Sequence, residues 1–297
     1  MRILLYLLLS LIPMLHYGQV TVLPIYANTE VPCLSDRPTT TEMNETIGLK
    51  VTNVAEPELH YYRPVPRAAS GKAVMILPGG GYVVQAWDHE GVDIARYLSS
   101  EGYHAFVLRY RLPGQITGEC KDRVALQDAQ RAMLLIRQYA DSLGYDADAV
   151  GVMGFSAGGH LAGSVSVHET TEGGLSSRPD FSILVYPVLR MDEQRSGHAG
   201  SQRALLGDDP EPDRLAYYNL PVQVDAETPP TLLIHASDDA GVSPLNSTAY
   251  YETLIANGVP ADLRIYAHGG HGFGSARELS FPTRAWLEEV TKWIASQ

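Results

Sequence analysis

One twelve-residue stretch constrains the fold of this 297-residue chain more than any other. Residues 150–161 read Val-Gly-Val-Met-Gly-Phe-Ser-Ala-Gly-Gly-His-Leu. An apolar run ends at Gly154, Ser156 follows shortly after it, and helix-forming residues with small side chains come next. Glycines around the serine leave room where a Cβ atom would collide with a neighbouring strand or helix. The stretch therefore predicts a strand, a sharp turn that presents Ser156 at the edge of a sheet, and a helix.

The serine stands in the pattern Gly-x-Ser-x-Gly, which is typical of a nucleophile at a strand-to-helix turn. A match of five residues is weak by itself, because glycine and serine are common in turns. A serine hydroxyl is also a poor nucleophile at neutral pH. A nucleophilic Ser156 therefore requires a general base, an acid that orients this base, and N–H groups that stabilise an oxyanion.

The length and the charge of the chain limit the fold classes and the binding partners that fit it. A chain of 297 residues suits one large α/β domain with insertions, which we favour over the alternative of two small domains. The formal net charge of −12 argues against a surface for nucleic acid or for an anionic membrane, because either partner would be repelled. No cysteines and histidines have the spacing of metal ligands, so we expect no structural zinc.

Residues 1–18 have the layout of a secretory signal peptide. Arg2 precedes an apolar run that is broken by Pro13 and is too short to span a bilayer comfortably. We expect cleavage near Gly18 or Gln19 and an exported protein, periplasmic or secreted, with no membrane span in the mature chain. The alternative is an N-terminal core helix.

The rest of the chain is expected to form an arm and one domain. Residues 19–46 are rich in Pro, Thr and Asn and predict an extended arm, which is followed by a catalytic domain over 47–297. Residues 189–225 have no strong period and predict a small cap insertion. Cys33 and Cys120 could pair in an exported protein, but the sequence leaves open whether they form a disulfide or stay unpaired.

Apolar runs alternate with helical stretches through this domain. After short strands at 47–54 and 59–62, we predict buried strands at 73–77, 104–108, 150–154, 181–186, 231–235 and 262–266. Helices are expected at 88–100, with Asp88 as its N-cap, and at 122–144, 157–167, 245–257 and 282–295. This alternation predicts a mostly parallel central sheet with helices on both faces.

A glycine-rich loop follows the first buried strand. Gly79, Gly80 and Gly81 let the backbone turn its N–H groups toward a developing negative charge. A loop that merely turns is the alternative, and a phosphate-binding loop would need a Gly-Lys-Ser/Thr ending that is absent here. Glu90, in the next helix, could hold this loop by a hydrogen bond or could favour the helix dipole, and we favour the second role.

Candidates for the acid and the base follow the last two predicted strands. Asp238 and Asp239 lie where a triad acid is expected, because the carboxyl ends of parallel strands converge on one edge of the sheet. We favour Asp239 over Asp238. His268 and His271 lie in a glycine-flanked loop, and either could accept the proton of Ser156. We favour His271, which is followed by Gly-Phe.

From about Ala73 to its C-terminus, the chain resembles the α/β-hydrolase esterases grouped with bacterial acetyl esterases, acetylxylan esterases and feruloyl-esterase-like proteins. The matching segments are Pro78-Gly-Gly-Gly-Tyr82, Asp88-His-Glu-Gly91, Leu108-Arg-Tyr-Arg111, Gly154-Phe-Ser-Ala-Gly-Gly-His-Leu-Ala162, Pro229-Pro230, Asp239-x-x-Val242 and Gly270-His-Gly-Phe273. Their order, with the glycine-rich loop before serine, aspartate and histidine, is that of the α/β-hydrolase fold.

The resemblance implies a role for each site residue. Ser156 is expected as the nucleophile, His271 as the general base and Asp239 as its orienting acid. The N–H groups of Gly80, Gly81 and Ala157 are expected as oxyanion donors. Related enzymes often have a histidine before the glycine triplet where this chain has Pro78, so the loop must be held differently here.

The resemblance and the expected export together predict a serine carboxylesterase. Its substrate would be an acylated carbohydrate such as acetylated xylan, and its two-step acyl transfer would need no metal or organic cofactor. The alternatives are a peptidase of the prolyl-oligopeptidase type, a lipase, which the polar cap disfavours, and a non-catalytic glycan-binding protein. Tyr217 and Tyr218 of the cap could line the pocket or pack inside the cap. The sequence leaves the oligomeric state open.

Overall fold

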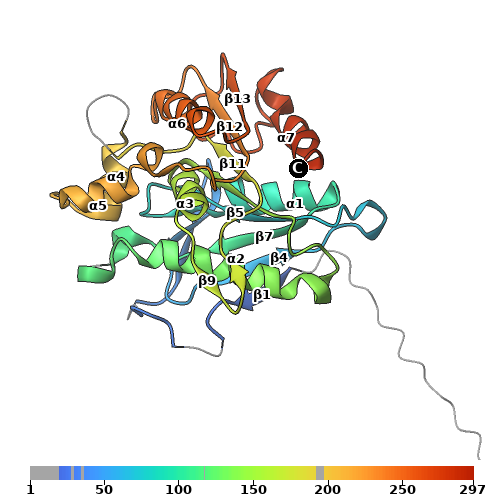
Figure 1. Cartoon of the computed structure of the whole chain (residues 1–297), viewed down its shortest axis with the longest axis horizontal. Helices are drawn as coiled ribbons and strands as arrows, with labels where there is room; N and C mark the ends of the chain where they lie inside the picture. Colours follow the sequence, from blue (N-terminus) through green and yellow to red (C-terminus); the bar gives the residue numbers. More distant parts are fainter. Residues whose placement is uncertain (1–19, 28–29, 35–36, 117, 192–196) are drawn as a thin grey trace, which may run out of the picture.

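The computed structural model describes residues 20–27, 30–34, 37–116, 118–191 and 197–297, so the predicted signal peptide lies outside the described residues. In these ranges, the central sheet has the strand order β1-β4-β7-β5-β8-β11-β12-β13 (Figure 1). The strands span Thr21–Pro24 (β1), Glu58–Tyr62 (β4), His104–Arg109 (β7), Ala73–Leu77 (β5), Val150–Phe155 (β8), Ser182–Val185 (β11), Thr231–Ala236 (β12) and Ala261–Tyr266 (β13). β1, β4 and β7 pair antiparallel, whereas all pairings from β7 to β13 are parallel.

Helices cover both faces of this sheet. The strands β5, β8, β11 and β12 are buried along their whole length, as their continuous apolar runs predict. Helices α1 (Asp93–Ser100) and α7 (Trp286–Ala295) pack into one core cluster. Helices α2 (Val124–Leu143), α3 (Ser156–Val167) and α6 (Leu245–Ala256) pack into the cluster on the other face. The predicted fold class, a mostly parallel α/β sheet of the α/β-hydrolase type, is confirmed.

The N-terminal region differs from its prediction. The stretch 19–46 carries β1 and β2 (Thr40–Asn44), and β2 pairs with β3 (Gly48–Asn53). Strand β3 also pairs with β6 (Gln85–Ala86), so the predicted strand 47–54 belongs to a second, three-stranded sheet and does not lead the central one. The side chain of Asn44 closes this hairpin by accepting the N–H groups of Thr46 and Ile47.

The start of the helix after the glycine-rich loop also differs. Residues Trp87–Val92 form a turn of π-helix, and the α-helix begins at Asp93. Asp88 does not cap it, because its Oδ2 accepts the N–H of Leu49 in β3 at 2.8 Å. The prediction of Asp88 as an N-cap was wrong because a long-range acceptor role replaces the local one.

Cys33 and Cys120 form a disulfide with their Cα atoms 6.1 Å apart, which resolves the alternative that the sequence left open. A buried ion pair lies beside it. Arg111 is fully buried and contacts Asp128 at 2.6 Å, and it also donates to the carbonyl of Pro32. The N-terminal segment is thus joined to the domain covalently and by hydrogen bonds.

The cap carries two short α-helices in its described part, α4 (Ala199–Leu206) and α5 (Pro212–Tyr218). Both extend from one end of the sheet (orange in Figure 1). Tyr218 is buried, and Tyr217 stacks on His168 with ring centroids 3.8 Å apart. These two tyrosines therefore pack inside the cap and against the domain. Within the ranges given above, no helix has both the length and the apolar character needed to cross a membrane.

Candidate active site

The strand-turn-helix around Ser156 has the geometry that its glycines predict. Ser156 follows β8 directly, begins α3 and has a φ of +52°, which is a strained left-handed conformation for a residue with a side chain. A Cβ atom on Gly158 would collide with the carbonyl oxygen of Leu77, and one on Gly154 would collide with the carbonyl of Gly158. Only glycine at these positions lets β5, β8 and α3 approach closely enough to present the serine.

The structure brings Ser156, His271 and Asp239 together. Ser156 Oγ lies 2.9 Å from Nε2 of His271, and Nδ1 of His271 lies 2.8 Å from Oδ2 of Asp239. The carboxylate is an acceptor, so Nδ1 carries the proton and Nε2 is available to accept the serine proton. The three residues come from segments after β8, β12 and β13, whose carboxyl ends meet at one edge of the sheet.

Asp238 and His268, the alternative candidates for the acid and the base, contact each other and the loop before His271 and do not contact Ser156. Oδ1 of Asp238 accepts the N–H groups of Gly269 and Gly270 at 2.9 and 2.8 Å, and its Oδ2 lies 3.4 Å from Nδ1 of the exposed His268. These contacts hold the loop that precedes His271. Neither side chain contacts the serine.

The carboxylate of Asp239 accepts four hydrogen bonds. Its Oδ1 accepts the N–H groups of Gly241 and Val242, both at 2.8 Å, and its Oδ2 contacts the rings of His271 and His235. Burial by itself would raise the pKa of Asp239, but the bonds from the two histidines and from Val242 outweigh it and hold the pKa well below its usual range. Asp239 is therefore ionised when His271 accepts a proton.

The predicted oxyanion donors lie in the glycine-rich loop after β5 and in the first turn of α3, which begins at Ser156. Gly80 and Gly81 follow β5 in a turn closed by hydrogen bonds from Val83 and Val84 to the carbonyl of Gly80. In the described part of the chain, no acceptor is found for the N–H groups of Gly80 and Gly81. Ala157 lies in the first turn of α3, where N–H groups have no acceptor within the helix. The three N–H groups are thus available to an oxyanion.

Glu90 holds the glycine-rich loop by a hydrogen bond to its first glycine. Its Oε2 accepts the N–H of Gly79 at 2.7 Å, and its Oε1 accepts the hydroxyl of Tyr186 at 2.9 Å. The same hydroxyl accepts the N–H of Gly274 at 3.1 Å, and the Tyr186 ring lies edge-on to His271 with centroids 5.2 Å apart. Favouring the dipole role for Glu90 was therefore wrong, because its buried carboxyl is turned toward the loop instead.

A second contact holds the other end of this loop. The hydroxyl of the buried Tyr82 lies 2.7 Å from Nδ1 of His160, whose Nε2 lies 2.8 Å from the carbonyl of Tyr218. A carbonyl only accepts, so Nε2 carries the proton and Tyr82 donates to Nδ1. Burial lowers the pKa of His160 to about 4, which keeps the ring neutral at physiological pH. The loop is thus held at Gly79 and Tyr82, which answers how it is fixed without a preceding histidine.

The cap approaches the same loop. Ser201 Oγ lies 3.9 Å from the position that a Cβ atom on Gly81 would occupy. Nδ1 of His198 accepts the N–H of Ser201 at 3.1 Å and thereby caps α4. The first turn of α4 therefore places polar side chains beside the predicted oxyanion donors.

A comparison with protein-family models matches residues 59–254 to the family described as BD-FAE. The chain belongs to the BD-FAE family. The matched residues include the glycine-rich loop, the serine turn and Asp239, so the predicted resemblance to the esterases of the feruloyl-esterase-like branch is confirmed.

Similar proteins include several hydrolases. An acetylxylan esterase of Xylanibacter ruminicola is 34% identical over 237 residues, which cover 78% of this BD-FAE chain and 47% of the relative. Endo-1,4-beta-xylanase B of Butyrivibrio fibrisolvens is 33% identical over 215 residues, which cover 70% of this chain and 33% of the relative. The chain thus spans about half or less of the length of these curated relatives.

A solved structure matches nearly the whole chain. The acetyl ester-xyloside bifunctional hydrolase from Caldicellulosiruptor lactoaceticus is 33% identical, with a TM-score of 0.79. The match covers 93% of this BD-FAE chain and 96% of that chain. The structural similarity therefore extends over nearly the whole chain.

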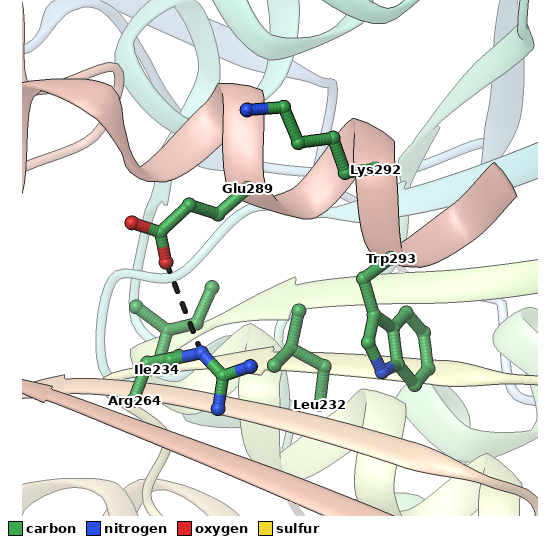
Figure 2. A pocket seen from close by; sticks show the side chains of 6 residues that line it. All are labelled: Leu232, Ile234, Arg264, Glu289, Lys292 and Trp293. Carbon is green, nitrogen blue, oxygen red and sulfur yellow. Dashed lines mark ion pairs between the residues drawn. The ribbon is translucent and has the colours of Figure 1, made fainter. Parts of the chain in front are cut away.

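A hollow of about 360 Å³ lies away from this site, between α7 and the strands β12 and β13 (Figure 2). It is lined by Leu232, Ile234, Arg264, Glu289, Lys292 and Trp293. Nε of Arg264 lies 3.8 Å from Oε2 of Glu289 across the hollow. None of the lining residues belongs to the candidate active site around Ser156.

The described residues contain no cluster of three or more His, Cys, Asp or Glu side chains that could hold a metal ion.

Proposed function

We propose that this chain is a serine carboxylic ester hydrolase that removes short acyl groups, above all acetyl, from xylan-type polysaccharides or oligosaccharides. The observation that carries the proposal is the continuous contact from Ser156 Oγ through His271 to Asp239, at 2.9 and 2.8 Å. The acetylxylan esterase and the acetyl ester-xyloside hydrolase among the similar proteins support the same reaction class.

The geometry supports acyl transfer in two steps. Ser156 Oγ attacks the ester carbonyl while its proton passes to Nε2 of His271, and the carboxylate of Asp239 stabilises the resulting imidazolium. The N–H groups of the glycine-rich loop and of Ala157 stabilise the oxyanion, each donor of this kind contributing about 10²–10³-fold to kcat. His271 then protonates the departing alcohol. Water repeats these steps on the acyl-enzyme, which releases the acid and restores Ser156.

The substrate part of the proposal depends on the relatives and on the charge of the chain. The names of the similar proteins point to acetylated xylan, and a neutral polysaccharide is compatible with a net charge of −12. We propose export to the periplasm or the medium because residues 1–18 have the layout of a signal peptide. An exported enzyme would meet polymeric substrate directly.

The test is acetate release from acetylated xylan and from p-nitrophenyl acetate, using protein produced without residues 1–18. We expect release from both substrates and its loss in Ser156→Ala. Ser166→Ala is the matched control, because Ser166 lies in the same helix and its hydroxyl contacts Ser182 Oγ at 2.7 Å, away from His271.

The other outcomes separate the alternatives. Activity on the small ester alone would keep the serine mechanism and exclude xylan as the substrate. Hydrolysis of small peptidyl amides without ester hydrolysis would favour the peptidase. If neither ester is cleaved, the esterase proposal is wrong, and binding of xylan by the intact protein would favour a glycan-binding protein.

A further inference from the structure

A second histidine lies behind the triad acid. His235, near the end of β12, is fully buried, and its Nε2 lies 3.2 Å from Oδ2 of Asp239. This is the same carboxylate oxygen that contacts Nδ1 of His271 at 2.8 Å. Asp239 Oδ2 therefore lies between two imidazole rings, one buried and one next to the serine.

The surroundings of His235 determine where its proton lies. Besides Asp239, its Nε2 lies 3.0 Å from the carbonyl of Val242. Both neighbours are acceptors, so Nε2 must carry a proton and share it between them. Nδ1 lies 2.8 Å from Oγ of the fully buried Ser247 in α6, and with the ring proton on Nε2 it can accept the hydroxyl proton of Ser247. Hydrogen bonds thus run without a break from Ser247 to Ser156.

These contacts immobilise both oxygens of the carboxylate. Oδ1 accepts hydrogen bonds from the N–H groups of Gly241 and Val242. Oδ2 accepts a hydrogen bond from Nε2 of the buried His235. His235 and His271 both contact Oδ2, at 3.2 and 2.8 Å. The bond from His235 also contributes most among the contacts that lower the pKa of Asp239 against the effect of burial.

We propose that His235 is a positioning residue, which directs Oδ2 of Asp239 toward His271 and acts on Ser156 through that carboxylate without contacting the substrate. This inference rests on the proposed serine esterase function. It assigns to α6 and β12 a part in the site, because Ser247 orients the His235 ring and the ring orients the acid.

The test compares two substitutions of His235 with p-nitrophenyl acetate as substrate. His235→Gln retains an amide N–H that can reach Asp239, whereas His235→Leu fills similar space without a donor. We expect kcat to stay within about threefold in the glutamine variant and to fall about 10- to 100-fold in the leucine variant, as for loss of a hydrogen bond to a charged group. KM should stay unchanged in both. A folded leucine variant with wild-type kcat, or with a change confined to KM, would overturn the proposal.

A spectroscopic measurement reports the hydrogen bond itself. We expect the downfield proton NMR signal of His271 Nδ1–H to persist in His235→Gln and to shift or broaden in His235→Leu. If the leucine variant does not fold, His235→Asn replaces it, because the shorter amide reaches toward Ser247 but not Asp239. An unchanged signal in a folded variant that lacks the donor would refute the positioning role.

The two proposals can fail separately. Absence of esterase activity in the wild-type protein would refute the proposed function. The NMR comparison needs no turnover, so it would still decide whether His235 holds Asp239 in place.

Discussion

Two carboxyl groups are buried beside Ser156, and their surroundings affect them in opposite directions. Burial raises the pKa of Glu90, and the hydrogen bonds from Gly79 and Tyr186 offset this only in part. For Asp239 the same effect of burial is outweighed, chiefly by the bonds from His235 and His271, so its pKa falls. The number and kind of donors, rather than burial, decide which group stays charged.

The difference fits what each group is expected to do. An ionised Asp239 can stabilise the imidazolium that forms when His271 takes the serine proton. Glu90 accepts the N–H of Gly79 at 2.7 Å and the hydroxyl of Tyr186 at 2.9 Å, and a neutral acid or an amide can still accept the N–H of Gly79. The comparison therefore predicts that Glu90→Gln retains activity, whereas Asp239→Asn loses it.

Removing the charge of Asp239 should have the largest effect. In Asp239→Asn, the amide group must face either the two backbone N–H groups or the two histidines, so one set of donors loses its acceptor. We expect kcat to fall about 10⁴-fold, because His271 can then adopt the tautomer that presents a proton to Ser156. Steady-state hydrolysis of p-nitrophenyl acetate checks this.

Asp238→Asn is the matched control. Asp238 bears the same carboxylate one residue earlier but contacts the loop at Gly269 and Gly270. We expect less than about a threefold change in kcat, because the side chain touches neither His271 nor Ser156. Equal losses in the two variants would contradict the assignment of Asp239 as the acid.

Glu90 should tolerate an amide but not truncation. Glu90→Ala removes the acceptor of the Gly79 N–H and the partner of Tyr186, so we expect kcat to fall about 10- to 100-fold through a displaced oxyanion loop. Glu90→Gln keeps an acceptor and should stay within about threefold of wild type. Measuring kcat and KM for both variants tests this. A loss in Glu90→Gln as large as in Glu90→Ala would show that the charge itself is needed.

Tyr186→Phe should have a smaller effect. It removes the hydroxyl that joins Glu90 to Gly274 and leaves the ring beside His271 in place. We expect a loss of about 1–3 kcal/mol in the free energy of unfolding, because a buried carboxyl and a buried N–H each lose a partner. Urea denaturation of the two proteins measures it. An unchanged midpoint and slope would mean that Tyr186 does not link the two loops.

The smallest expected effect is the pH dependence of stability. The pKa of Glu90 is raised in the folded protein, so its contribution to stability is present below the ordinary value of 4.5 and is lost as pH rises through the folded value. Asp239 has a lowered pKa, so its contribution is present above 3.8 and is lost as pH falls. The free energy of unfolding of Glu90→Gln should therefore increase relative to that of wild type as pH rises.

Urea denaturation of wild type and Glu90→Gln at about pH 4 and about pH 8 provides the comparison. The change between the two pH values that wild type and Glu90→Gln share is the pH dependence that does not depend on Glu90. A free energy of unfolding of Glu90→Gln that falls relative to that of wild type as pH rises would contradict the raised pKa.

Much of the fold could be predicted because the signals are local. The helix predicted at 122–144 is α2, Val124–Leu143, and it ends where Gly144 takes a left-handed φ of +86°. The serine turn likewise depends on residues within a few positions of Ser156. The pattern failed at Asp88 and at β3, where a long-range contact between the two replaced the local preference.

Three features of the site had only weak local signals. In the sequence, Glu90 is indistinguishable from an acidic residue that favours the dipole of a first helical turn. In the structure, its carboxyl accepts the N–H of Gly79 in the glycine-rich loop. His160 and His235 stand in otherwise apolar or small-residue segments, and a polar residue there was the only available sign of a buried network. Their partners come from the loops after β5 and β12 and from the cap, which no periodicity relates to them.

The order of strands and helices, the turn at Ser156 and the residue types of the triad follow from the amino-acid sequence, because neighbouring residues encode periodicity and backbone freedom. The choice between Asp238 and Asp239 depended on which carboxylate the turn after β12 directs toward His271, 32 positions from Asp239. The pairing of Cys33 with Cys120, 87 residues apart, likewise depended on how the N-terminal segment packs. Such contacts form only when distant segments are brought together, so packing of the whole domain decides them.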